Sequence, residues 1–339
     1  MERIWTDRTI DAFFILLRSG LEEKDIEHPL ILTEEEWEDI LSVSAMQTVT
    51  GQVARGIAHL PAGNAVPDMI LMKFMKKTDH IVRTSAIISE VRDKLVSAFR
   101  SGGLDPVIMK GPESASFYLR PELRESGDLD IFFPGDIFEK ACDQVSSMGI
   151  IMDKAPDGSV RYLFEGIEID QHQKYFDLHT ERQLPEVPGP YATLLMLSSH
   201  ILKHCMTAGV GLRQLCDMAM AYRALEDSYD KTALAAMFER TGLESWNKLL
   251  ASFLEKYLGC RSHPYSQDEL PDPTALMDII MEGGNFGHHA AGRKKAEKGP
   301  LSARKKDTVA RMLRRLPFSL KYGRKELFCY FAELVRGNI

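Results

Sequence analysis

Two aspartates one residue apart, Asp128 and Asp130, lie in an apolar segment that predicts a β-strand over residues 128–133. Successive side chains on a strand point to opposite faces, so the two carboxylates share one face. Leu129 and Ile131 point the other way, into a core. Neighbouring carboxylates repel each other, and hard divalent cations such as Mg2+ prefer oxygen ligands. The pattern therefore predicts a metal site of the kind used in phosphoryl or nucleotidyl transfer.

A Lys110-Gly111 turn precedes this strand and follows another short predicted strand, Pro106–Met109. Because glycine has no side chain, the backbone at Gly111 can approach a phosphate closely. The turn opens a short predicted helix, residues 113–119, whose N-terminal N–H groups suit an anion. Lys110 and Arg124 supply positive charge, and a guanidinium can hold a phosphate through two hydrogen bonds.

Residues 167–172 predict another strand, on which apolar and polar residues alternate. Its two isoleucines point to one face, whereas Glu168 and Asp170 point to the other. A third carboxylate could therefore come from this strand. His172 lies at its end, where a structural hydrogen bond and a contact to phosphate are both reasonable roles.

These pieces resemble the polymerase-β-like nucleotidyltransferase superfamily, and in particular its bacterial family of uncharacterised nucleotidyltransferases. The residues that carry the resemblance are Lys110-Gly111, Arg124, Asp128-Leu129-Asp130-Ile131 and Asp170-Gln171-His172. The resemblance is strong over residues 104–175 and weaker over most of the remaining chain. Asp170 rather than Glu168 matches the acid-x-His step of the family.

The resemblance implies an enzyme that moves NMP from an NTP, with ATP expected, to a hydroxyl or similar group of an unidentified acceptor and releases pyrophosphate. It implies Asp128, Asp130 and Asp170 as catalytic residues and as ligands of Mg2+ or Mn2+. It also implies a nucleotide-binding set, namely Lys110, Gly111, Arg124, His172 and Arg213. Asp170 would ligate a second metal ion and help to activate the acceptor.

Other readings of these residues stay open. A second acid-x-His step, Asp177-Leu178-His179, would replace Asp170-x-His172 if the strand register differs. The protein could also be a catalytically silent nucleotide-binding or toxin-antitoxin-like regulator that acts on a protein or RNA. A third possibility is a non-catalytic scaffold built from the helical ends of the chain.

The elements around the site predict an α+β fold, with a nucleotidyltransferase-type mixed sheet and helices at both ends. Residues 1–100 read as an N-terminal helical region, in which 43–58 continues as a helix and 69–100 forms a long one. Residues 101–185 read as the α/β core, with strands also at 150–152 and 160–164. Residues 186–339 read as a C-terminal helical region with a basic loop at 293–306.

The C-terminal region contains several polar residues without an evident role. His200 and His204 lie one helical turn apart, which allows a zinc pair, although no third ligand is evident. Arg213 or His204 could approach the nucleotide, or both could belong to a polar network between helices. The glycine-rich segment 282–289 fits no phosphate-binding fingerprint, and the basic loop is either a solvated linker or a clamp for a polyanion.

Composition limits the function classes. The chain has 339 residues and a net charge of −7, so a general nucleic-acid binder is not favoured, although nucleic acid stays a possible partner. Five scattered cysteines without a CxxC pair indicate free thiols in a reducing compartment. The N-terminus lacks a signal-peptide layout, and no apolar run is long enough to span a bilayer. We therefore expect a cytoplasmic protein without membrane contact.

Overall fold

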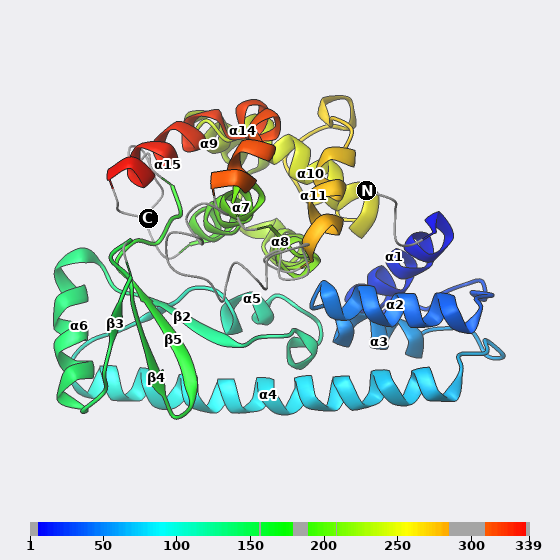
Figure 1. Cartoon of the computed structure of the whole chain (residues 1–339), viewed down its shortest axis with the longest axis horizontal. Coiled ribbons are helices and arrows are strands. Elements are labelled where there is room, and N and C mark those ends of the chain that lie inside the picture. Colours follow the sequence, from blue (N-terminus) through cyan, green and yellow to red (C-terminus); the bar gives the residue numbers. More distant parts are fainter. Residues whose placement is uncertain (1–5, 156, 179–188, 208, 285–308, 337–339) are drawn as a thin grey trace.

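The computed structural model shows a helical protein built around one mixed sheet, which confirms the α+β prediction. The structure describes residues 6–155, 157–178, 189–207, 209–284 and 309–336. A long helix, α4 (Asp68–Ser101), runs along one side of the molecule, beneath both the sheet and the N-terminal helices (Figure 1). The C-terminal helices lie on the opposite side.

The sheet has five strands in the order β1-β2-β5-β4-β3. Their bounds are β1 Val107–Ile108, β2 Asp128–Phe132, β3 Asp153–Lys154, β4 Val160–Phe164 and β5 Ile167–His172. β2 pairs with β5 in parallel, and the other neighbours are antiparallel. The predicted strand at 150–152 is wrong, because pairing with β4 begins only at Asp153.

The two faces of the sheet differ, as the alternation of side chains predicts. One face is apolar: Leu129, Ile131 and Ile169 are fully buried. They pack in a cluster with Leu95 and Phe99 of α4 and with apolar residues of α6 (Gly135–Ser147). The opposite face carries the acidic residues of β2 and β5, so the packing that holds the sheet against α4 also directs these acids away from it.

The N-terminal helices α1 (Asp7–Glu22), α2 (Glu34–Met46) and α3 (Thr50–Ala58) pack on one another and on α4. The side chain of Thr33 and that of Glu36 form a capping box that starts α2. The predicted continuous helix over 43–58 is wrong. The chain breaks at Thr48, whose φ of 52° is left-handed, and the chain turns before α3 begins.

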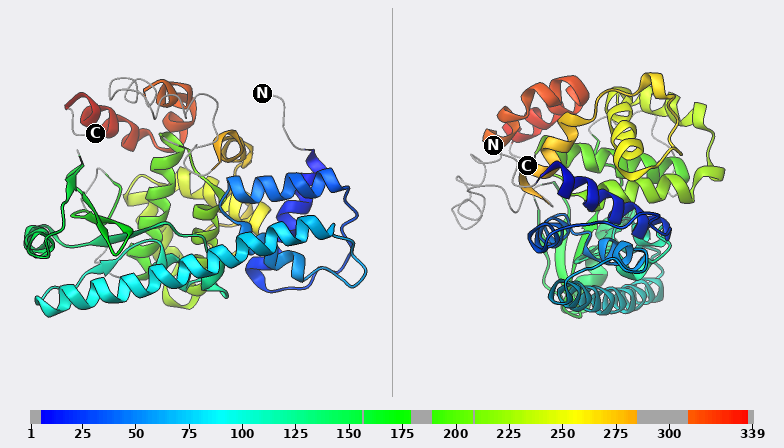
Figure 2. Two further views of the ribbon diagram at one scale, coloured as in Figure 1. Left: turned by 60° about the horizontal axis from the view of Figure 1, so that its bottom comes forward. Right: turned by 90° about the vertical axis from the view of Figure 1, so that its right-hand side faces the viewer.

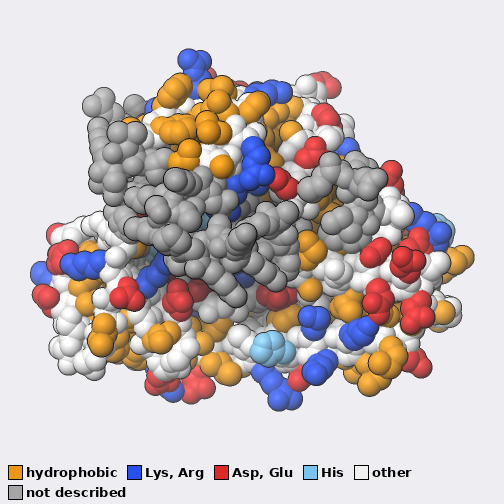
Figure 3. All heavy atoms as spheres, viewed as in Figure 1, with side chains coloured by type: hydrophobic (Ala, Val, Ile, Leu, Met, Phe, Trp, Pro, Cys, Tyr) orange, Lys and Arg blue, Asp and Glu red, His pale blue; other side chains and the backbone are white. Residues whose placement is uncertain are grey.

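Helix α4 begins and ends within one residue of the predicted long helix and spans most of the molecule (Figure 2). Its outer face is exposed. At its N-terminal half, Met69, Met72 and Met75 are exposed close to Lys76 and Lys77. In Figure 3, hydrophobic, basic, acidic and histidine side chains all lie along the edge where α4 lies.

Most of the remaining helices share the main apolar core with the N-terminal helices. Their bounds are α5 Pro112–Ser116, α7 Pro190–Met206, α8 Leu212–Ala224, α9 Lys231–Arg240, α10 Glu244–Leu258, α11 Thr274–Gly283, α14 Leu316–Tyr322 and α15 Arg324–Arg336. Most of α7 is buried on all sides. Polar side chains on α7 therefore stand out, because they must find partners inside the protein.

The cysteines are free thiols, as predicted, and four of the five are buried. Among the described helices, none is both long and apolar enough to cross a membrane.

Candidate active site

The acidic face of the sheet brings together residues that lie 40 positions apart in the sequence. The parallel register of β2 and β5 places Asp130 beside Asp170, and Phe132 beside His172. One potential ligand atom from each of Asp130, Asp170 and His172 lies within 4.8 Å of the other two. Two of the three predicted catalytic acids thus meet in one group with the predicted histidine.

Asp130 is held at one of its two oxygens. Lys110 Nζ lies 3.2 Å and His172 Nε2 2.9 Å from its Oδ1. Oδ2 makes no hydrogen bond with the described residues. Burial by itself would raise the pKa of Asp130, but the charge of Lys110 and the hydrogen bond from His172 outweigh it and lower that pKa. Asp130 is therefore ionised, with one oxygen available to a ligand.

Asp128 lies on the same strand face as Asp130, but its pKa shifts in the opposite direction. It forms no hydrogen bond or ion pair with the part of the chain that the structure describes. Burial and the negative charge of Asp130 raise its pKa, against the opposing effects of Arg213 and Lys110. A cation between Asp128 and Asp130 would offset the repulsion between their negative charges.

Asp170 is also held at one oxygen, by a residue that the sequence did not reveal. Arg161 on β4 pairs with Asp170 across the antiparallel ladder, and its Nε lies 2.7 Å from Oδ1. Only the register of β4 against β5 reveals this pairing, and the sequence does not give that register. Glu168, the rival acid, pairs in register with Asp128 but is exposed and does not belong to the ligand group.

The Lys110-Gly111 turn lies against the strand that carries the aspartates. Gly111 has φ 59° and ψ −111°, and a Cβ there would meet the carbonyl oxygen of Asp128 at 3.3 Å. A glycine is therefore required at this position. Burial tends to lower the pKa of Lys110, but the charges of Asp130 and Asp177 outweigh this effect and raise it. The helix that follows, α5, is shorter than predicted.

Arg124 is not directed at the acidic group. Its guanidinium donates to both carboxylate oxygens of Asp217 on α8, at 3.0 and 2.7 Å. Nη1 donates to the carbonyl of Glu125 and to Ser126, and the Tyr118 hydroxyl also donates to Asp217. This predicted nucleotide-binding residue therefore lies in a buried network that joins the loop before β2 to the helical half.

Arg213, the other predicted nucleotide-binding arginine, lies in the first turn of α8, next to this network. Its Nη1 donates to the carbonyl oxygen of Glu125 at 2.8 Å. Burial and the positive charge of Arg124 lower its pKa. Its charge in turn acts on Asp128, so Arg213 lies close to the acidic group.

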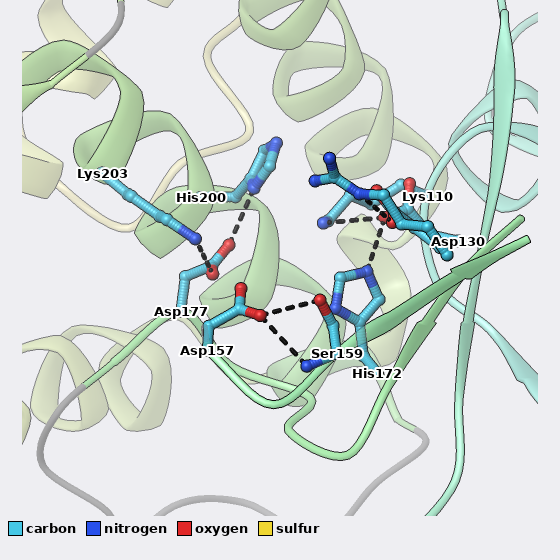
Figure 4. Close-up of polar contacts among 10 residues, drawn as sticks. Lys110, Asp130, Asp157, Ser159, His172, Asp177, His200 and Lys203 are labelled. Atoms are coloured by element: carbon cyan, nitrogen blue, oxygen red, sulfur yellow. Dashed lines mark hydrogen bonds and ion pairs between the residues drawn. The ribbon is translucent and has the colours of Figure 1, made fainter. Parts of the chain in front are cut away.

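A second polar cluster faces the first from the helical side. Asp177 accepts hydrogen bonds from His200 Nδ1 at 2.8 Å and from Lys203 Nζ at 2.7 Å. Figure 4 shows His200 and Lys203, which project from α7, across from Lys110 and Asp130. Asp157, which accepts hydrogen bonds from Ser159, lies between the two sides. We call Asp177, His200 and Lys203 the α7 cluster.

The α7 cluster changes the reading of two motifs. Asp177 does not replace Asp170 in the acidic group. It accepts hydrogen bonds from two side chains of α7 instead. The His200 ring packs edge-on against His204, with centroids 4.4 Å apart, but Nδ1 of His200 is already engaged by Asp177. Within the described residues, the candidate metal group contains neither of these histidines. His179, most of segment 282–289 and the basic loop at 293–306 lie outside the described residues.

The acidic group suits a divalent cation in its donor chemistry. Asp130 and Asp170 each have one oxygen fixed by a basic residue and a second oxygen without a partner in the described structure. Carboxylate oxygens suit Mg2+ and Mn2+. His172 Nε2 is within hydrogen-bonding distance of Asp130. Because a carboxylate can only accept, this nitrogen carries the proton and orients Asp130 rather than a metal.

Comparison with known proteins agrees with this geometry. Residues 33–188 match the model of a family described as uncharacterised nucleotidyltransferase. The matched segment contains all five strands, the Lys110-Gly111 turn and the acidic group, and ends before α7. No curated protein and no solved structure matches the chain. The family indicates a transferase enzyme.

Proposed function

We propose, from the premise that residues 33–188 belong to the uncharacterised nucleotidyltransferase family, that the protein transfers NMP from an NTP to a hydroxyl group of an acceptor. Pyrophosphate is the leaving group, and the reaction depends on a divalent metal ion, Mg2+ or Mn2+. ATP is the expected nucleotide. The acceptor binds on the helical side of the acidic face.

The observation that carries this proposal is the juxtaposition of acids on the face of β2 and β5 that is directed away from α4. Asp130 and Asp170 lie beside each other, and Asp128 adds a third carboxylate on the same face. A structural cluster of this kind would be neutralised by its own basic neighbours. Here the neighbours hold only one oxygen of each paired acid, and Asp128 has a raised pKa. The group is therefore incomplete without a cation.

The residues around the group have separate roles in this proposal. Asp128, Asp130 and Asp170 would hold the metal ion, which stabilises negative charge on the reacting phosphate oxygens. Lys110, which is buried and charged, lies beside Asp130 and offsets charge on the phosphates. His172 orients Asp130, and Arg161 orients Asp170. The strained turn at Gly111 brings backbone close to the phosphates.

The first test is calorimetric titration of each NTP, with and without Mg2+, into the wild type and the Asp128→Asn/Asp130→Asn double variant. Binding that requires the metal and disappears in the variant supports the proposal. Binding that persists in the variant would place the nucleotide elsewhere. Failure of every NTP to bind the wild type would favour a catalytically silent or regulatory protein.

The matched control is Asp143→Asn, which removes a carboxylate from an exposed position on α6. It changes the net charge by the same amount per substitution, but away from the acidic face. We expect its metal-dependent NTP binding to equal that of the wild type. This control separates loss of a ligand from a general change in charge.

A further inference from the structure

Asp177 and His200 form a pair with a defined hydrogen-bond direction. An ionised carboxylate can only accept, so the proton in the 2.8 Å contact belongs to Nδ1 of His200. Burial by itself would raise the pKa of Asp177, but the charge of Lys203 and the hydrogen bond from His200 outweigh it and hold that pKa well below its ordinary value. Asp177 is therefore ionised, and it fixes the imidazole in the tautomer whose Nε2 has a lone pair.

Nε2 of His200 is available as a proton acceptor. It makes no hydrogen bond with the described residues, and the His200 side chain is 15% exposed. The groups that face His200 are Asp177 from the segment after β5, Lys203 and His204 from α7, and Lys110 from the turn after β1. Burial, followed by the charge of Lys110, lowers its pKa to about 4, so the ring is neutral at pH 7.

His200 also faces the proposed reaction centre. A proton on His200 would lower the pKa of Asp130, and the charge of Lys110 acts on His200, although these residues come from different halves of the molecule. Figure 4 shows the His200 side chain across from Lys110 and Asp130. The acids on the sheet are occupied by basic residues and, in the proposed function, by metal. A separate group is therefore needed to receive the proton of the acceptor.

We propose that His200, oriented by Asp177, is the general base that accepts the proton of the acceptor hydroxyl. This inference rests on the proposed function and deepens it. The O–H bond of the acceptor breaks and its proton moves to Nε2. The acceptor oxygen bonds to the α-phosphorus of the NTP, and the bond from that phosphorus to the bridging oxygen breaks. Pyrophosphate leaves with the electron pair, and Asp177 stabilises the imidazolium that forms.

Nucleotide binding should strengthen this base. In the free protein, the positive charge of Lys110 disfavours protonation of His200. A triphosphate that pairs with Lys110 supplies negative charge to the same space and offsets that effect. Burial still lowers the pKa of His200, but the effect of Lys110 is reduced, so the bound substrate favours proton transfer to the ring.

The test uses the full chain with Mg2+ and each [α-32P]NTP, with water as the nucleophile, and measures release of NMP and pyrophosphate. His200→Asn is the informative variant, because its side-chain amide can still donate to Asp177 but lacks the basic nitrogen. We expect Mg·NTP affinity within about twofold of the wild type and turnover reduced by about 10² to 10⁴-fold. The rise of rate with pH that the base produces should disappear.

His80→Asn, on the exposed outer face of α4, is the control, and it should keep wild-type turnover. Asp177→Asn is the second variant. It should lower turnover while the imidazole remains, because an amide no longer imposes the tautomer. Unchanged turnover in His200→Asn, with nucleotide binding intact, would overturn the proposal.

Nitrogen-15 NMR of the histidines in the nucleotide-free protein provides a readout without activity. We expect a neutral ring with a protonated Nδ1 and an unprotonated Nε2 for His200 at pH 7. A proton on Nε2 would overturn the assignment even if His200→Asn fails to fold. Absence of Mg·NTP binding to the wild type would refute the proposed function and this base together, and calorimetry distinguishes that result from loss of turnover alone.

Discussion

Two buried ion pairs differ in how fully their carboxylates are hydrogen-bonded. The pairs are Arg124–Asp217 and Lys110–Asp130. The Arg124 and Asp217 side chains are 5% and 4% exposed, and two hydrogen bonds join them. Tyr118 donates to the carboxylate as well. Lys110 and Asp130 are 15% and 11% exposed and share a single longer contact of 3.2 Å. One Asp130 oxygen remains open, and another carboxylate lies next to it.

This difference in hydrogen bonding indicates that one pair stabilises the fold and that the other can bind a ligand. A buried pair whose donors and acceptors are matched has nothing left for a ligand, so it joins structural elements. A pair left incomplete beside a like charge is poorly stabilised by the protein alone, and a cation or substrate can complete it. Arg124 and Lys110 were both predicted from sequence to contact the nucleotide. Of these two residues, the geometry favours only Lys110.

The largest expected effect is on catalysis at the incomplete pair. Asp130→Asn removes the carboxylate that Lys110 and His172 hold in place, together with its charge toward the metal. We expect turnover of Mg·NTP to fall by about 10⁴-fold, or about 5 kcal/mol of transition-state stabilisation. Single-turnover release of pyrophosphate measures it. A loss below tenfold would remove Asp130 from the metal site.

The complete pair should show its effect in stability instead. Arg124→Met leaves Asp217 buried without its partner, which we expect to lower the free energy of unfolding by about 3–5 kcal/mol. Denaturant unfolding followed by circular dichroism measures this change. The protein that remains folded should bind Mg·NTP as the wild type does, since Arg124 does not face the acidic group.

The double variant Arg124→Met/Asp217→Leu is the control for the complete pair. Replacement of both charges by apolar side chains removes the uncompensated carboxylate, so much of the lost stability should return. A double variant as unstable as Arg124→Met would show that the loss comes from packing. Weak Mg·NTP binding by the folded double variant would contradict the contrast between the two pairs.

The α7 cluster should make stability depend on pH. The pKa of His200 is lowered from 6.5 to about 4 in the folded protein. Below pH 6.5 the unfolded chain binds a proton that the folded protein refuses until about pH 4. Stability therefore falls as the pH falls through this window, by about 3 kcal/mol from this residue. Unfolding curves at pH 7 and pH 4.5 measure the slope.

His200→Asn has no imidazole to titrate and should show a smaller fall in stability between these two pH values. The other titrating groups contribute to both proteins, so the difference isolates His200. Equal slopes for the two proteins would mean that His200 is protonated near its ordinary pKa, which would also weaken its assignment as a neutral base.

The smallest expected effect is a gain in stability. Asp128 has a raised pKa because burial and Asp130 disfavour its charge. A raised pKa means that folding disfavours the ionised form, and the neutral amide of Asp128→Asn avoids this cost. We expect about 1 kcal/mol of stabilisation in the metal-free protein, with loss of metal-dependent NTP binding. A thermal melt without Mg2+ measures it, and a destabilised variant would contradict the stated repulsion.

The fold and much of the acidic face could be predicted from local patterns. Alternation along residues 128–133 and 167–172 correctly placed Asp128 with Asp130 and separated Asp170 from the isoleucines. The periodicity of residues 69–100 predicted α4. These predictions succeed because the side-chain direction in a strand or helix follows from its backbone repeat.

The sequence by itself therefore determined the two strands that carry the acids, the long helix and the face on which each acid lies. Tertiary structure decided which groups meet across the chain: Asp130 with Asp170, Arg161 with Asp170, Arg124 with Asp217, and Asp177 with His200. Residue spacing predicts neighbours within an element but not the register between strands or the placement of a helix. Those follow from how the apolar faces pack together, which a local pattern does not contain.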